Sequence, residues 1–122
     1  MRKFILISLL INVCVLIPVC LGLITKALWA QQAYGPSSPA RGILLSVYMA
    51  ICAVSLFLLF RPNPMMVAAL LVVQVVYKVT TPFTVGTLTN PVVISNLLIA
   101  AMHSITLFVI ARNTAAVKAG VA

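Results

Sequence analysis

The sequence contains no aspartate and no glutamate, whereas lysine and arginine together number 8 among its 122 residues. Without carboxylate side chains there is no carboxylate general acid or base and no carboxylate site for Mg²⁺ or Ca²⁺. The chain also lacks the acidic ring that selects cations in many pores. We therefore predict no enzyme activity, no catalytic residues and no cation-conducting pore.

Histidine and cysteine are scarce as well, with one His and three Cys. Cys14, Cys20 and Cys52 lie in apolar runs, and neither a C-x-x-C pair nor Cys/His metal-ligand spacing occurs. We predict no metal site and no cofactor. Contact with a haem or a quinone stays open, because His103 can supply one ligand. The cysteines are expected to be small core residues, with a buried disulfide as the alternative.

Charged residues make up 7% of the chain, far below the roughly 25% of soluble domains. The net charge of +8 comes from scattered basic residues, of which only Arg2 and Lys3 are adjacent. Nucleic-acid binding needs a clustered basic surface that contacts several phosphates, so we predict no nucleic-acid partner. Single basic residues beside apolar runs are instead typical of membrane-border anchors, which attract anionic lipids.

Hydrophobic residues make up 64% of the sequence and gather in four long runs. A bilayer core of about 30 Å is crossed by about 20 helical residues. The runs cover residues 4–27, 42–60, 64–80 and 91–111. They are continuous rather than alternating, which favours helices over barrel strands. The sequence predicts an all-α integral membrane protein, a four-helix transmembrane bundle that forms one domain over residues 1–122.

The connecting segments carry helix-boundary residues. Asn63 and Asn90 each stand directly before a proline, so we expect them to be N-caps with proline at the first helical position. Gly86 indicates a turn in the last loop. Pro82 is expected to end the third helix or bend its last turn. The segment 31–41 is polar, contains Gly and Pro, and is expected to be a loop.

Four spans place both termini on one side of the membrane. Five basic residues then fall on that side, namely Arg2, Lys3, Arg61, Arg112 and Lys118. Three fall opposite, namely Lys26, Arg41 and Lys78. Because cytoplasmic segments carry the excess of Lys and Arg, we expect both termini in the cytoplasm. The expected location is the bacterial inner (plasma) membrane.

Polar residues within spans are costly and are candidates for function by default. The candidates are Asn12, Gln74, Tyr77, Lys78, Asn96 and His103. Gln74, Tyr77 and Lys78 share one helix face by their spacing. At about 1.5 Å per residue, Asn12, Gln74 and His103 fall at similar depth, so a hydrogen-bonded cluster is predicted. Its role is left open between helix–helix packing and a site for a ligand, a quinone or protons.

Lys78 has no carboxylate in the chain with which to pair. Its ammonium group can reach a lipid phosphate at the interface, or it can pair with a partner's acidic residue or an anionic ligand. A second contact feature is the row Gly42, Ser46 and Ala50, at which another helix can approach closely. This row fits an internal contact and a dimer contact equally well.

These features favour a non-catalytic accessory or assembly subunit of a membrane complex. The expected partners are anionic lipids and another membrane protein or a second copy of the chain. The alternative is a homo-oligomeric carrier or channel for a small neutral or anionic solute.

Overall fold

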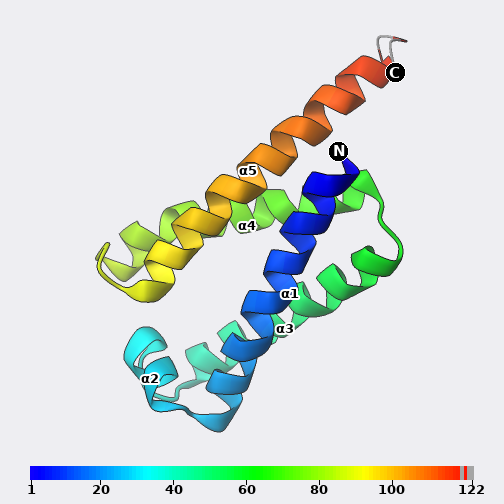
Figure 1. Cartoon of the computed structure of the whole chain (residues 1–122). Helices are drawn as coiled ribbons and strands as arrows, with labels where there is room; N and C mark the ends of the chain where they lie inside the picture. The colour runs from blue at the N-terminus through cyan, green and yellow to red at the C-terminus, as the bar shows by residue number, and fades with distance from the viewer. Residues whose placement is uncertain (119, 121–122) are drawn as a thin grey trace. The chain divides into compact units, whose positions relative to one another are not determined.

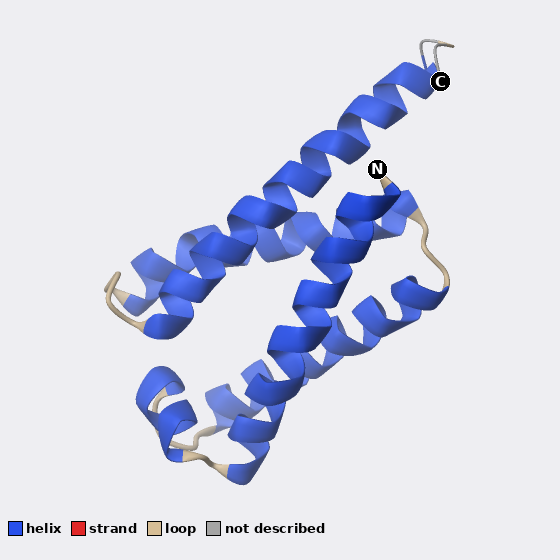
Figure 2. Ribbon diagram, viewed as in Figure 1, coloured by secondary structure: helices blue, strands red, loops and turns tan. Residues whose placement is uncertain are grey.

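The computed structural model describes residues 1–118 and 120, and this part of the chain consists of helices joined by loops, with no strand (Figures 1 and 2). The helices are α1 (Arg2–Thr25), α2 (Leu28–Tyr34), α3 (Pro39–Phe60), α4 (Pro64–Val85) and α5 (Pro91–Lys118). Among the described residues, four helices are long and apolar enough to cross a membrane, namely α1, α3, α4 and α5. The predicted helical character of the four apolar runs is confirmed.

Side-chain caps explain where the long helices begin. The Asn63 side chain accepts hydrogen bonds from two first-turn amides of α4 at 3.0 and 3.3 Å, and Asn90 accepts one from Val92 at 2.8 Å. Both predicted N-terminal caps are thus confirmed. Ser38 caps α3 in the same way. Gly86 ends α4 at a φ of 83°, a left-handed conformation that glycine adopts without the steric cost of a Cβ.

The extent of α4 decides between the two expectations for Pro82. The helix does not end at Pro82 but continues to Val85, so Pro82 lies in its last turn, and a bend there stays a prediction. Threonine hydroxyls bond backbone carbonyls along this part of the helix, including Thr81 to the carbonyl of Tyr77 at 2.7 Å. Such bonds help a membrane helix to tolerate an internal proline.

One expectation was wrong, because the first loop contains the short helix α2. Helix α1 ends just before it in a Schellman-type turn. Lys26 has a φ of 57°, and the Ala27 amide donates to the Gly22 carbonyl at 3.0 Å. The Trp29 ring then packs against Gly22, where an added Cβ would lie 2.1 Å from the ring. Helix α2 was not predicted, because seven residues are too few for a clear periodic pattern.

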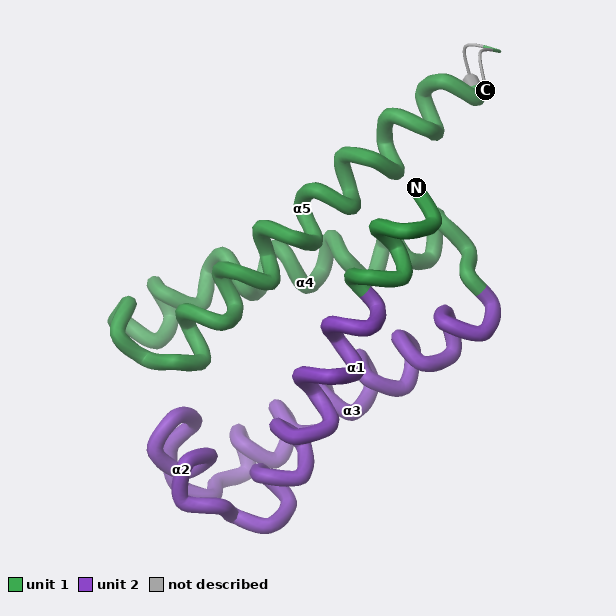
Figure 3. The backbone as a smooth tube through the Cα atoms, in the orientation of Figure 1, with its two compact units in different colours: residues 1–8, 62–122 green, residues 9–61 purple. Residues whose placement is uncertain are grey.

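The chain forms two compact units (Figure 3). One consists of residues 1–8 and 62–122, and the other of residues 9–61. In the first unit α4 and α5 pack against each other (Figure 1). The buried residues of α4, namely Val67, Leu71, Gln74 and Lys78, recur at helical spacing and form one stripe. These buried positions are apolar near the start of α4 and polar toward its end.

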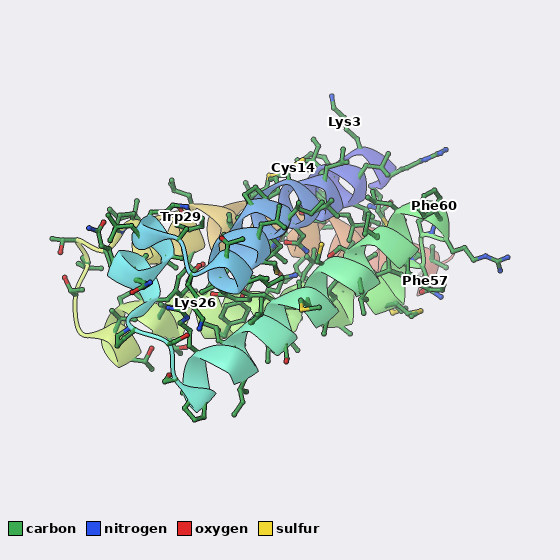
Figure 4. All side chains as sticks on the ribbon, turned by 90° about the horizontal axis from the view of Figure 1, so that it is seen from below. Lys3, Cys14, Lys26, Trp29, Phe57 and Phe60 are labelled. Atoms are coloured by element: carbon green, nitrogen blue, oxygen red, sulfur yellow. The ribbon has the colours of Figure 1, made fainter. Side chains whose placement is uncertain are left out.

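The second unit contains most of α1, together with α2 and α3. Tyr34 of α2 packs edge-to-face on Tyr48 of α3 with ring centroids 6.0 Å apart. Outward side chains are largely apolar, such as Phe60, which is 85% exposed near the end of α3 (Figure 4). All three cysteines are free, and the expected core position is wrong for Cys14, which is exposed.

Candidate functional site

The candidate site lies on the facing sides of α4 and α5, and we call it the polar stripe. It consists of Gln74 and Lys78 on α4 and of Asn96 and His103 on α5. All four side chains are buried. They reach the same interface because buried residues on each helix recur three or four positions apart. The remaining buried positions of α5 at this spacing are Val93, Ala100, Thr106 and Ile110.

Gln74 is the least satisfied residue of the polar stripe. Its side chain is 0% exposed, and within the described part of the chain neither Nε2 nor Oε1 has a hydrogen-bond partner. A buried donor or acceptor without a partner costs about 1–3 kcal/mol. Folded proteins rarely retain such groups without a reason. The amide can both donate and accept, so it suits a ligand group that does the same.

Lys78 lies one helical turn after Gln74 and is 4% exposed. Its ammonium group donates to the Tyr77 hydroxyl at 2.7 Å and lies 4.5 Å from the centroid of that ring. The hydroxyl lowers the cost of burying the ammonium group but carries no negative charge. Tyr77, predicted as a neighbour on the same face, thus contacts Lys78 directly. The sequence contains no carboxylate side chain that could balance this charge.

Asn96 and His103 complete the polar stripe from α5. The Asn96 amide donates to the Thr81 hydroxyl of α4 at 3.3 Å, which links the two helices beyond Lys78. His103 is fully buried and lies within electrostatic reach of Lys78. The arrangement provides amide donors, amide acceptors and one cation along the helix interface, with no anionic group. It therefore favours neutral or anionic groups over cations.

Asn12 was predicted to join Gln74 and His103. Its amide donates to the Ser55 hydroxyl of α3 at 3.0 Å, within residues 9–61. Its proposed contact with Gln74 and His103 would connect the two units and stays a prediction.

Sequence reasoning missed a second polar contact, which ties α1 to α5 near the chain start. The hydroxyls of Ser8 and Thr106 lie 2.7 Å apart, and both side chains are buried. Thr106 also donates to the Phe4 carbonyl at 3.2 Å. Small hydroxyl residues within apolar helices are common, so spacing alone did not single these out. Their fit to known interhelical contacts indicates a packing role.

The small-residue row of α3 faces outward. Gly42, Ser46 and Ala50 are all exposed, and an added Cβ at Gly42 would meet no atom within 4 Å. Within residues 9–61 the row therefore makes no close helix contact. It remains accessible to another helix.

The described residues contain no group of three or more His, Cys, Asp or Glu that could hold a metal ion. Comparison with protein-family models gave no match, and comparisons with curated proteins and with solved structures gave no significant match. The polar stripe and the composition of the chain are therefore the features from which a function can be inferred.

Proposed function

We propose that this protein is a non-catalytic carrier or channel that binds a small neutral or anionic solute in the polar stripe. The observation that carries the proposal is the Gln74 amide, buried without a hydrogen-bond partner among the described residues. It lies one turn from Lys78, a buried cation in a chain without carboxylate side chains. A solute with an acceptor or a negative charge would satisfy both groups.

The proposed setting is a four-helix bundle in the bacterial inner membrane, with both termini in the cytoplasm and anionic lipids around it. The four apolar helices and the bias of basic residues toward the terminal side support this topology. Fusions of a reporter active only in the cytoplasm, placed after residue 118 and in the loop around Ser37, test the orientation. Reporter activity at the loop but not at the C-terminus would show that the orientation is the opposite of the proposed one.

The function is tested with purified protein and a panel of neutral and anionic solutes. A solute that binds only the folded state at 100 times its Kd stabilises the protein by about 2.7 kcal/mol. Solutes that raise the unfolding midpoint are then assayed for flux into proteoliposomes containing this protein alone. We expect Gln74→Leu and Lys78→Met to abolish both effects, while the exposed control Arg61→Gln retains them. Flux that survives in both stripe variants would refute the proposal.

A role as an accessory subunit, or assembly of the chain with itself, is the second candidate. The outward position of Gly42, Ser46 and Ala50 supports it. The burial of Lys78 argues against direct pairing of this residue with a partner's acid. Purification in mild detergent with native mass determination distinguishes a partner complex from a homo-oligomer. We expect Ala50→Leu to weaken whichever assembly forms, and an unchanged assembly would remove this row from consideration.

A further inference from the structure

A cavity of about 310 Å³ lies in the unit of residues 9–61, apart from the polar stripe. Its polar lining comes from Lys26, Ser37, Ser38 and Arg41, and leucine and isoleucine side chains of α1 and α3 form much of the rest. The volume is at the lower end of the roughly 300–1,000 Å³ typical of small-molecule pockets. Two basic residues and two hydroxyls therefore share one concave surface.

Arg41 is the unusual member of this lining, because it is only 6% exposed. Its guanidinium donates to the Gly35 carbonyl at 2.8 Å and to the Leu23 carbonyl at 3.3 Å. A guanidinium has five N–H donors, so further donors remain for another acceptor. The carbonyls supply hydrogen bonds but no full negative charge, and the sequence has no carboxylate side chain. A buried charge without a counter-charge is costly.

The backbone does not remove this excess of positive charge. The Leu23 carbonyl belongs to the last turn of α1, whose C-terminus carries about −0.5 charge, whereas the N-terminus of α3 after Ser38 carries about +0.5. These partial charges roughly cancel at the cavity. The charges of Lys26 and Arg41 are left, and the hydroxyls of Ser37 and Ser38 can add hydrogen bonds to an anion.

We propose that this cavity binds a negatively charged phosphate group. The planar guanidinium matches phosphate oxygens in a bidentate manner, and the lysine adds a point charge. Lys26 and Arg41 stand at the ends of apolar helices, where lipid phosphates are found in a membrane. Both a lipid headgroup and free phosphate present this chemistry, so the experiment separates the two sources.

The test uses the full chain in a neutral detergent, with the emission of Trp29 as one readout. Trp29 is the single tryptophan of the sequence and lies three residues after Lys26. Inorganic phosphate is titrated against chloride at constant ionic strength, and phosphatidylglycerol against phosphatidylcholine. Native mass spectrometry counts the bound molecules. Saturation by inorganic phosphate assigns a free anion, and saturation by phosphatidylglycerol alone assigns a lipid headgroup. Either result supports the proposal.

Three variants decide whether the bound phosphate occupies this cavity. Lys26→Asn removes a charge and keeps the left-handed backbone, which asparagine tolerates. Arg41→Gln removes the guanidinium, and Arg61→Gln is the matched control at the opposite end of α3. A charge-assisted hydrogen bond contributes enough for roughly a ten- to hundredfold loss of affinity in the first two variants. The control should bind as the wild type does.

If Arg41→Gln fails to fold, Lys26→Asn alone carries the comparison, with helical content checked by circular dichroism. The proposal is overturned if neither phosphate source saturates the wild-type protein. It is also overturned if Lys26→Asn and Arg61→Gln weaken binding equally, because binding would then depend on net charge alone.

Discussion

Replacing Gln74 by leucine should stabilise the solute-free protein, unlike most substitutions of a fully buried residue. Leucine is of similar size and has no polar atoms that need partners. The wild-type side chain leaves Nε2 and Oε1 without hydrogen bonds in the described part of the chain. With a penalty of about 1–3 kcal/mol for an unsatisfied buried polar group, we expect a gain of that size in the free energy of unfolding.

The measurement is reversible unfolding in detergent, followed by circular dichroism, with and without a solute that binds. In the presence of the solute the wild type should be more stable than Gln74→Leu, because only the wild type gains binding energy. Asn12→Leu is the matched control, since its amide has a partner in Ser55 at 3.0 Å. That variant should lose stability, by about 1 kcal/mol.

A loss of more than about 1 kcal/mol in Gln74→Leu without solute would refute the reasoning, because it would mean that the amide has a stabilising partner. If Gln74→Leu gains the same stability with and without every solute, no solute binds the amide, and the wild-type side chain is a packing defect. In that case the polar stripe would lose its main support as a binding site.

Three further predictions concern local structure. Gly22→Ala should displace the Trp29 ring, because the new Cβ would lie 2.1 Å from it. We expect the free energy of unfolding to fall by about 1–3 kcal/mol and the tryptophan emission to shift. Thr106→Val should cost about 0.6 kcal/mol, and a double-mutant cycle with Ser8→Ala should show coupling between the two hydroxyls. Asn63→Ala should cost about 1 kcal/mol through loss of the α4 cap, whereas an unchanged unfolding midpoint would show that the cap is dispensable.

The spans and their caps could be predicted from sequence because each rests on a local rule. A continuous apolar run in lipid must form a helix to satisfy its backbone hydrogen bonds, and an asparagine directly before a proline is typical of the start of a helix. The shared face of Gln74 and Lys78 followed from helical spacing, which is also local. Helix α2 was missed because its seven residues are too few for a clear periodic pattern, and the packing of its Trp29 on Gly22 is a contact between helices that no local rule predicts.

Partners of polar groups were harder to predict than their positions. Ser55 was not among the predicted candidates, yet its hydroxyl accepts a hydrogen bond from the Asn12 amide at 3.0 Å. Helix rotation decides such contacts, and spacing within one helix does not determine which neighbour it faces. Arg41 was read as a border residue, whereas the fold buries it against two backbone carbonyls.

The continuation of α4 through Pro82 has a consequence for the motion of the chain. Proline has no N–H, so the carbonyl four positions earlier, that of Lys78, lacks its usual helical donor. The turn between Lys78 and Pro82 is therefore held by one backbone hydrogen bond fewer than a turn in the middle of the helix. It should open at lower cost and exchange its amide hydrogens sooner. Such fraying would expose the end of the helix nearest the Lys78 ammonium group, giving a solute a way in while the rest of α4 stays folded.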